Sequence, residues 1–140
     1  MVNPSALARY DVIHVYYEFE GQVGERKFFV VLSHGDKHAI CIKATAKVEK
    51  YQLDQKQKAG CVCYKANEVP CFVQETAIQP HNVVPISYEH IVREDRNGRY
   101  ENKGTLPPDF HVKLVGAIRA SIVMSPKRKR FVLELIGEVL

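Results

Sequence analysis

The hydrophobic pattern of the first half of the chain predicts short β-strands. Val12 to Phe19 is rich in β-branched and aromatic residues and contains an alternation of apolar positions, which is typical of a half-buried strand. Phe28 to Leu32 is continuously apolar and too short for a surface helix, so we expect a strand buried on both faces. Further strand patterns follow at residues 39–44, 60–64 and 71–74.

Proline and charge interrupt this pattern farther along. The stretch IQPHNVVPI, residues 78–86, contains two prolines and is predicted to be extended or turning chain, because proline stops a helix. Residues 93–104 combine charges with the pair Asn97-Gly98 and are predicted to form turns. The charged, glutamine-rich residues 47–59 indicate a long exposed loop.

One amphipathic helix is predicted late in the chain. Apolar residues recur at helical spacing from Phe110 to Ile122, which gives the helix one apolar stripe. The pair Pro107-Pro108 suits the first turn, and Asp109 suits the positive end of the helix dipole. We expect Ser125-Pro126 to end this helix, and the last ten residues, FVLELIGEVL, fit either a strand or a short helix.

Short strands and one late helix predict an all-β or α+β fold. The specific expectation is a small β-barrel of roughly five to seven strands with the amphipathic helix packed on it. Strands do not alternate with helices, so a parallel sheet is not expected. The 140 residues suit one domain, without an internal repeat or linker, and a basic extension begins at about residue 126.

The net charge and the cysteines give weaker indications of function than the hydrophobic pattern gives of the fold. The net charge of +4 suits a nucleic-acid-binding surface without requiring one. No run of about 18 apolar residues is present and the N-terminus lacks the features of a signal peptide, so we expect a cytoplasmic protein with reduced thiols. Cys61, Cys63 and Cys71, with His81, could bind zinc, but the spacing of the first two is unusual. Buried free thiols are preferred, and neither a metal nor a cofactor is expected.

Several ordered motifs resemble the MazF/PemK toxins of toxin–antitoxin systems. RYDVIHVYY, a turn, and ERKFFVVLSH match the pattern of the first two family strands, the second of which ends in Val-Leu-Ser. AICIKATAK is similar to the third family strand, which ends at a threonine. A segment near TAIQPHNVVPI, then Gly104, then a helix starting at Leu-Pro follow in the family order. The resemblance covers most of the chain from Asp11 to Ser125.

The resemblance implies an SH3-like barrel that forms a homodimer, cleaves single-stranded RNA without a metal and is inhibited by a cognate antitoxin protein. The basic residue before the second strand and the threonine ending the third carry the family's chemistry. Aligned on Val-Leu-Ser, these fall on Lys27 and Thr45. Lys27-Phe28 replaces the family's Arg-Pro pair, and Arg26 stands one residue away, so either cation could serve. Alternation along an extended segment would instead place Arg26 on the opposite face.

Metal-free cleavage uses the ribose 2′-hydroxyl as nucleophile, so the protein must bind the phosphate and move protons. Lys27 can place a charge at the phosphate but lacks the two-pronged grip of arginine. The proton carrier stays open among four candidates: His14, His34, Glu20 and Glu25. We expect the RNA-binding residues to be His34, Lys43, Lys47, Lys127 and Arg128.

Other functions stay open. A non-catalytic SH3-like module that binds RNA or a protein would also fit the altered Lys27-Phe28 pair. A topoisomerase poison on a related barrel is a third interpretation, in which the C-terminal tail would engage gyrase. Motifs for nucleotide hydrolysis, dinucleotide redox chemistry and zinc proteolysis are absent, so these classes are set aside.

Overall fold

The computed structural model describes residues 2–46 and 59–138. These residues form six β-strands, a short 3-10 helix and three α-helices. In chain order the elements are η1 (Pro4–Ala6), β1 (Asp11–Tyr17), β2 (Glu25–His34), β3 (His38–Thr45), β4 (Val62–Tyr64), β5 (Thr76–Ser87), α2 (Tyr88–Arg96), β6 (Tyr100–Thr105), α3 (Phe110–Ala120) and α4 (Pro126–Leu135).

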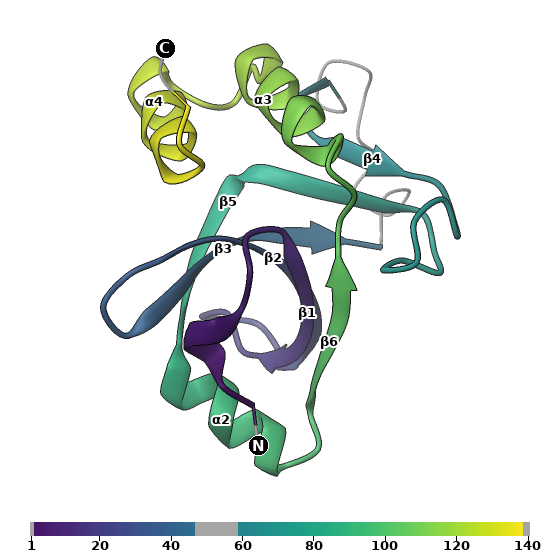
Figure 1. Ribbon diagram of the computed structural model, residues 1–140, viewed down its shortest axis with the longest axis vertical. Coiled ribbons are helices and arrows are strands. Elements are labelled where there is room, and N and C mark those ends of the chain that lie inside the picture. The colour runs from purple at the N-terminus through teal and green to yellow at the C-terminus, as the bar shows by residue number, and fades with distance from the viewer. Residues whose placement is uncertain (1, 47–58, 139–140) are drawn as a thin grey trace.

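The strands form one antiparallel sheet in the order β4-β5-β3-β2-β1-β6. The sheet curls strongly into half a barrel (Figure 1). Register shifts after Val12, Val31 and Ile42 interrupt three of the strand pairings, and such irregularities increase the local twist of a sheet. The predicted class, a small curled β-structure with an amphipathic helix packed on it, is therefore confirmed, and its α+β form is the correct one.

Both faces of the sheet are covered, which is why β2 is apolar at successive positions. Val30 and Leu32 face the core beneath α3 and α4, whereas Phe29 and Val31 face the core beneath α2 and η1. All four side chains are fully buried. Figure 1 shows α3 and α4 on one side of the sheet and α2 on the opposite side. The prediction of a strand buried on both faces is confirmed.

The late amphipathic helix is shorter than predicted, and a second helix follows it. α3 ends at Ala120, and Ile122, expected on its apolar stripe, is 64% exposed. The pair Ser125-Pro126 begins α4 instead of ending α3, because the Ser125 hydroxyl accepts a hydrogen bond from the Arg128 backbone N–H at 3.1 Å. The basic run and the start of FVLELIGEVL thus belong to one helix. Among the described residues, no helix is long and apolar enough to cross a membrane.

The charged stretch 93–104 was predicted to form turns only, and this was wrong. It holds the end of α2 and all of β6 except its last residue, Thr105, with residues 97–99 connecting the two elements. The Ser87 hydroxyl caps α2 by accepting from the His90 backbone N–H at 3.0 Å, and Ile91 is its one fully buried apolar side chain. The helix was missed because so few apolar residues mark its buried side.

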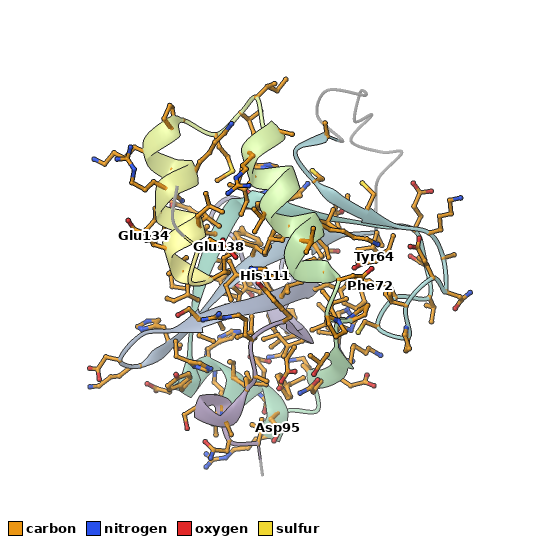
Figure 2. All side chains as sticks on the ribbon, turned by 45° about the horizontal axis from the view of Figure 1, so that its top comes forward. Tyr64, Phe72, Asp95, His111, Glu134 and Glu138 are labelled. Atoms are coloured by element: carbon orange, nitrogen blue, oxygen red, sulfur yellow. The ribbon has the colours of Figure 1, made fainter. Side chains whose placement is uncertain are left out.

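The chain between β4 and β5 contains no strand at residues 71–74, contrary to prediction. Cys71 and Phe72 are nonetheless buried, and the ring of Phe72 lies 5.6 Å from that of Phe28 and 6.3 Å from that of Tyr64. Figure 2 shows Tyr64 and Phe72 near α3. Their apolar character reflects packing of a loop, whereas the proline-containing stretch after it is extended, as expected, in β5. Of the predicted loop 47–59, only Ala59 lies within the described residues.

A polar chain joins the C-terminal end to the rest of the fold. His111 on α3 bonds through Nδ1 with the Tyr10 hydroxyl and through Nε2 with Glu138 Oε1 at 2.6 Å (Figure 2). Burial raises the pKa of Tyr10 to about 12. Next to it, the Arg9 guanidinium donates a hydrogen bond to the Ile136 carbonyl at 3.1 Å. These contacts anchor the segment that follows α4 to the start of β1.

Candidate functional site

A small cleft lies where β2 begins and β3 ends. It encloses about 100 Å³. Phe28 pairs with Ala44, so the preceding and following residues, Lys27 and Thr45, lie next to each other on the opposite face of the sheet. Two pieces of chain 18 residues apart are thereby joined by the β2–β3 register. The lining residues are Glu25, Arg26, Lys27, Phe28, Lys43, Ala44, Thr45 and Ala46.

Lys27 is the buried cation of this cleft. Its side chain is 8% exposed, because it shares a sheet face with Phe29. Its ammonium donates to Glu25 Oε1 at 2.9 Å, and the side chain of Glu25 is 49% exposed. A charge this buried needs a partner, and Glu25 supplies it from the same strand face two residues away.

Phe19 brings a second cation to the cleft. The Lys27 ammonium lies 5.3 Å from the centre of its ring, and the Lys43 ammonium lies 5.2 Å from the same centre. Both distances are within the range of cation–π attraction, so one ring holds two positive charges close together. Thr45, 6% exposed, belongs to the same cleft. Phe19 was not predicted as a site residue, because the sequence pattern places it in the first strand, whereas it lies in the chain that follows β1.

Arg26 also lines the cleft, but its guanidinium points to the other face of the sheet, toward Gly98. In the extended segment its side chain alternates with that of Lys27, and its guanidinium donates to the Gly98 carbonyl at 2.5 Å. The bond ties β2 to the turn before β6, on the other face from Lys27 and Thr45. Of the two candidate cations, Lys27 and Arg26, the β2–β3 register places Lys27 beside Thr45.

The remaining expected RNA-binding residues do not gather at the cleft. His34 ends β2 at its opposite end, where its ring bonds with the Tyr88 hydroxyl at 2.6 Å and the Leu7 carbonyl at 2.7 Å. Lys127 and Arg128 are exposed on α4, which covers the other face of the sheet. Lys47 lies outside the described residues. Among the members of this group that lie in the described part of the chain, the structure brings only Lys43 to the cleft.

The structure separates the four candidate proton carriers. His14 stacks on Phe28 at 4.1 Å on the other face of the sheet, and its pKa is lowered by burial and by the nearby Lys103 and Arg26 charges. His34 is at the far end of β2. Glu20 is exposed and is not among the residues that line the cleft. Glu25 is the carboxylate that lines it.

The cysteines are placed as buried thiols with one exception. Cys61 and Cys71 are buried, and burial raises the pKa of Cys61 to about 11. Cys63 points to the surface. Within residues 2–46 and 59–138, no group of three or more His, Cys, Asp or Glu side chains is arranged to hold a metal ion. The zinc interpretation of Cys61, Cys63, Cys71 and His81 therefore has no geometric support.

The arrangement can bind an oxyanion. Two ammonium groups flank one aromatic ring, a threonine hydroxyl lies in the same cleft, and a carboxylate is adjacent to one of the ammonium groups. Such a set can neutralise a phosphate and accept a proton from a hydroxyl next to it. A scan against protein-family models and a search of curated proteins found no match for this chain.

Proposed function

We propose that this protein is an endoribonuclease of the toxin–antitoxin type, with the cleft between β2 and β3 as its active site. The observation that carries the proposal is the convergence of Lys27, Lys43 and Thr45 on one cleft where β2 begins and β3 ends. Lysine is rarely buried, and here Lys27 is 8% exposed, pairs with Glu25 and lines a cleft. A cationic cleft of this kind suits the phosphate of an RNA strand.

The residues have distinct roles in the proposed reaction. The 2′-oxygen of the ribose bonds to phosphorus, and the bond from phosphorus to the 5′-oxygen breaks, which leaves a cyclic phosphate and a 5′-hydroxyl. Lys27 and Lys43 stabilise the added negative charge, and Thr45 donates its hydroxyl to a phosphate oxygen. Glu25 accepts the proton of the 2′-hydroxyl, the 5′-oxygen takes a proton from water, and the hydroxide that remains takes the proton from Glu25, which restores the carboxylate.

One observation favours a second candidate, a module that binds RNA without cleaving it. The ammonium of Lys27 is already paired with Glu25 at 2.9 Å, and a lysine grips a phosphate with less geometric control than an arginine. A phosphate would then be held by charge alone, without the alignment that cleavage requires. Binding and cleavage must therefore be measured separately.

Incubation with a mixed-sequence RNA in EDTA tests the proposal. We expect cleavage by the wild type, with a loss of roughly 10²- to 10³-fold in Lys27→Ala and in Thr45→Ala. Arg26→Ala should retain cleavage, because its guanidinium contacts Gly98 and not the cleft. Lys103→Ala is the matched control, since Lys103 also pairs with a glutamate two residues away at 2.9 Å, but on β6.

Three results would contradict this assignment of the active site. RNA that is bound but stays intact would favour the binding module, and RNA that is neither bound nor cut by folded protein would exclude both candidates. Cleavage that depends on Arg26 and not on Lys27 would move the active cation to the other face of the sheet.

The toxin part of the proposal rests on the resemblance to the MazF/PemK family. On this resemblance we also expect the protein to form a homodimer and to be inhibited by an antitoxin protein that covers the cleft. Induced expression of the wild type in a bacterial host should then arrest growth, whereas Thr45→Ala at the same expression level should not. Equal growth of both strains, with both proteins soluble, would remove the toxin assignment while leaving RNA cleavage to be judged in vitro.

A further inference from the structure

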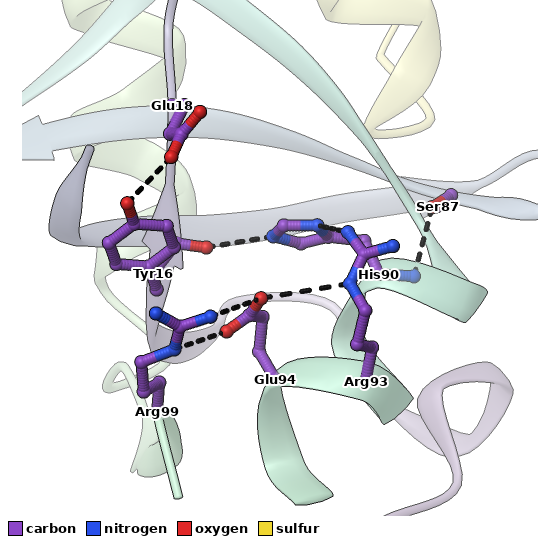
Figure 3. Close-up of polar contacts among 7 residues, drawn as sticks. All are labelled: Tyr16, Glu18, Ser87, His90, Arg93, Glu94 and Arg99. Carbon is purple, nitrogen blue, oxygen red and sulfur yellow. Dashed lines mark hydrogen bonds and ion pairs between the residues drawn. The ribbon is translucent and has the colours of Figure 1, made fainter. Parts of the chain in front are cut away.

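A second, larger pocket lies beside the proposed active site, between β1, α2 and the start of β6. Its volume is about 410 Å³, within the range of roughly 300–1,000 Å³ that small-ligand pockets occupy. Polar and aromatic side chains dominate its walls (Figure 3). The lining residues are Tyr16, Tyr17, Glu18, His90, Arg93, Glu94 and Arg99.

The pocket's polar groups are held in place before any ligand arrives. Glu94 is 3% exposed and accepts two hydrogen bonds from Arg99, at 2.7 and 3.1 Å. His90 Nε2 donates to the Tyr16 carbonyl at 2.7 Å, and Arg93 donates to His90 Nδ1 at 2.9 Å. Both bonds are satisfied by a neutral His90 with its hydrogen on Nε2. The network engages one edge of the Arg93 guanidinium, with Nη2 bonded to His90 and Nε 3.7 Å from Glu94 Oε1, while the side chain is 59% exposed.

The pocket carries two positive and two negative side chains, so its charge favours a neutral ligand over an anion. The positive charges of Arg93 and Arg99 are offset by the carboxylates of Glu94 and Glu18. A free phosphate would be repelled by Glu18, which is exposed at the mouth and bonds with the Tyr16 hydroxyl at 2.7 Å. A flat, neutral ligand with both acceptors and donors suits such walls better. Nucleobases have this composition.

Of the nucleobases, guanine pairs best with the two exposed charged groups of the pocket, Arg93 and Glu18. The side chain of Arg93 is 59% exposed, and arginine pairs with the O6 and N7 acceptors of guanine through two parallel hydrogen bonds. The opposite edge of guanine carries N–H donors, which a carboxylate such as Glu18 accepts. Adenine offers an amino group where guanine has O6, so it would place a donor against the arginine.

An aromatic row connects this pocket to the proposed active site. The ring of Tyr17 lies 5.5 Å from that of His90 and 4.8 Å from that of Phe19. Phe19 is the ring that holds Lys27 and Lys43. Two ring-to-ring contacts, His90 with Tyr17 and Tyr17 with Phe19, thus connect the pocket to the phosphate cleft.

We propose that the pocket between β1, α2 and β6 binds a guanine base of the RNA strand whose neighbouring phosphate occupies the Lys27–Thr45 cleft, with Arg93 and Glu18 reading the base. This inference rests on the proposed function for its substrate, since the strand is the one to be cleaved. It makes Arg93 a specificity-determining residue of the reaction, outside the phosphate cleft.

Binding of oligonucleotides that lack the 2′-hydroxyl tests the inference apart from cleavage. The probes are labelled deoxyuridine heptanucleotides with one central guanine, adenine or 7-deazaguanine, measured by fluorescence anisotropy. We expect the wild type to bind the guanine probe at least about tenfold more tightly than the adenine probe. Arg93→Ala should remove most of this preference, and 7-deazaguanine, which lacks N7, should weaken binding to the wild type but not to Arg93→Ala.

Arg96→Ala is the matched control, because Arg96 lies on the same helix, carries the same charge and does not line this pocket. It should keep the guanine preference. No preference in the wild type, or an equal preference in wild type and Arg93→Ala, would overturn the inference even if RNA is cleaved in EDTA. A guanine preference that depends on Arg93, in a protein that leaves RNA intact, would uphold the pocket and refute the nuclease.

Discussion

Replacement of Lys27 by methionine distinguishes a lysine kept for function from one kept for stability. Methionine has a similar length and can keep the apolar contacts of the lysine stem next to Phe29, but it removes the ammonium group. Lys27 is 8% exposed and its partner Glu25 is 49% exposed, so the carboxylate left behind stays hydrated. The substitution therefore removes the charge without leaving a buried, unpaired group.

The expected change in stability is small. An ion pair with a half-exposed partner contributes about 1 kcal/mol or less, and the contact with Phe19 at 5.3 Å about 0.5–1 kcal/mol. Against these losses, the desolvation cost of a buried ammonium disappears, and replacing buried ion pairs by apolar residues is often neutral or stabilising by about 1–4 kcal/mol. We expect the free energy of unfolding to fall by less than about 1 kcal/mol, or to rise.

The expected change in activity is large. A donor that stabilises the charge developing on the phosphate lowers the activation free energy by roughly 3–4 kcal/mol. Its loss should therefore slow cleavage about 10²- to 10³-fold. Urea unfolding followed by circular dichroism measures the first quantity, and single-turnover RNA cleavage in EDTA measures the second. Lys103→Met serves as the control, because it removes the same kind of lysine–glutamate pair from β6 and should leave cleavage unchanged.

Two results would refute this reasoning. A loss of more than about 3 kcal/mol in unfolding free energy, with activity lost only in proportion to the unfolded fraction, would make Lys27 a structural residue. Cleavage at the wild-type rate by a stable Lys27→Met protein would show that the ammonium takes no part in the reaction.

Two further predictions concern the polar groups around the site. Glu94→Gln should lower the free energy of unfolding by about 1–3 kcal/mol in urea titrations. The amide can accept only one of the two hydrogen bonds from Arg99, turns an N–H donor toward the other, and removes the charge of the ion pair. Arg99 is 40% exposed and stays hydrated, which keeps the loss moderate. An unchanged urea midpoint would contradict this. Burial lowers the pKa of His14, so the unfolded chain, with a pKa near 6.5, takes up the proton more readily than the folded one. Stability should therefore decline between about pH 7 and about pH 5, with a shallower decline in His14→Asn; equal slopes would disprove the assignment.

Patterns that depend on local chemistry were readable from the sequence. The continuous apolar run of β2 predicts burial on both faces, and the structure shows Phe29 to Leu32 fully buried between two cores. The stripe from Phe110 likewise predicts α3. Lys27 and Thr45 were singled out through a family resemblance, and the β2–β3 register places both in one cleft.

Other features were ambiguous because the same residues suit two structures. Ser125-Pro126 can follow one helix or begin the next, and only the hydrogen bond from the Arg128 backbone to the Ser125 side chain decides that it begins α4. α2 shows little apolar periodicity, and Ile91 is the only apolar side chain that it buries completely. The helix therefore could not be predicted from its sequence without the sheet face on which it packs. Cys71 and Phe72 resemble a strand because buried loops and strands both need apolar residues.

The sequence by itself determined which segments are apolar enough to form the sheet and the late helix, because burial and periodicity act over a few neighbouring residues. Only the tertiary structure decided which charges meet. Lys27, Lys43 and Phe19 come from separate segments and converge because the sheet curls and its strands pair in one register. Lys127 lies on α4, which packs on the other face of the sheet, so tertiary packing keeps it away from the cleft. His34 is distant for a local reason, because it ends the extended strand that Lys27 begins.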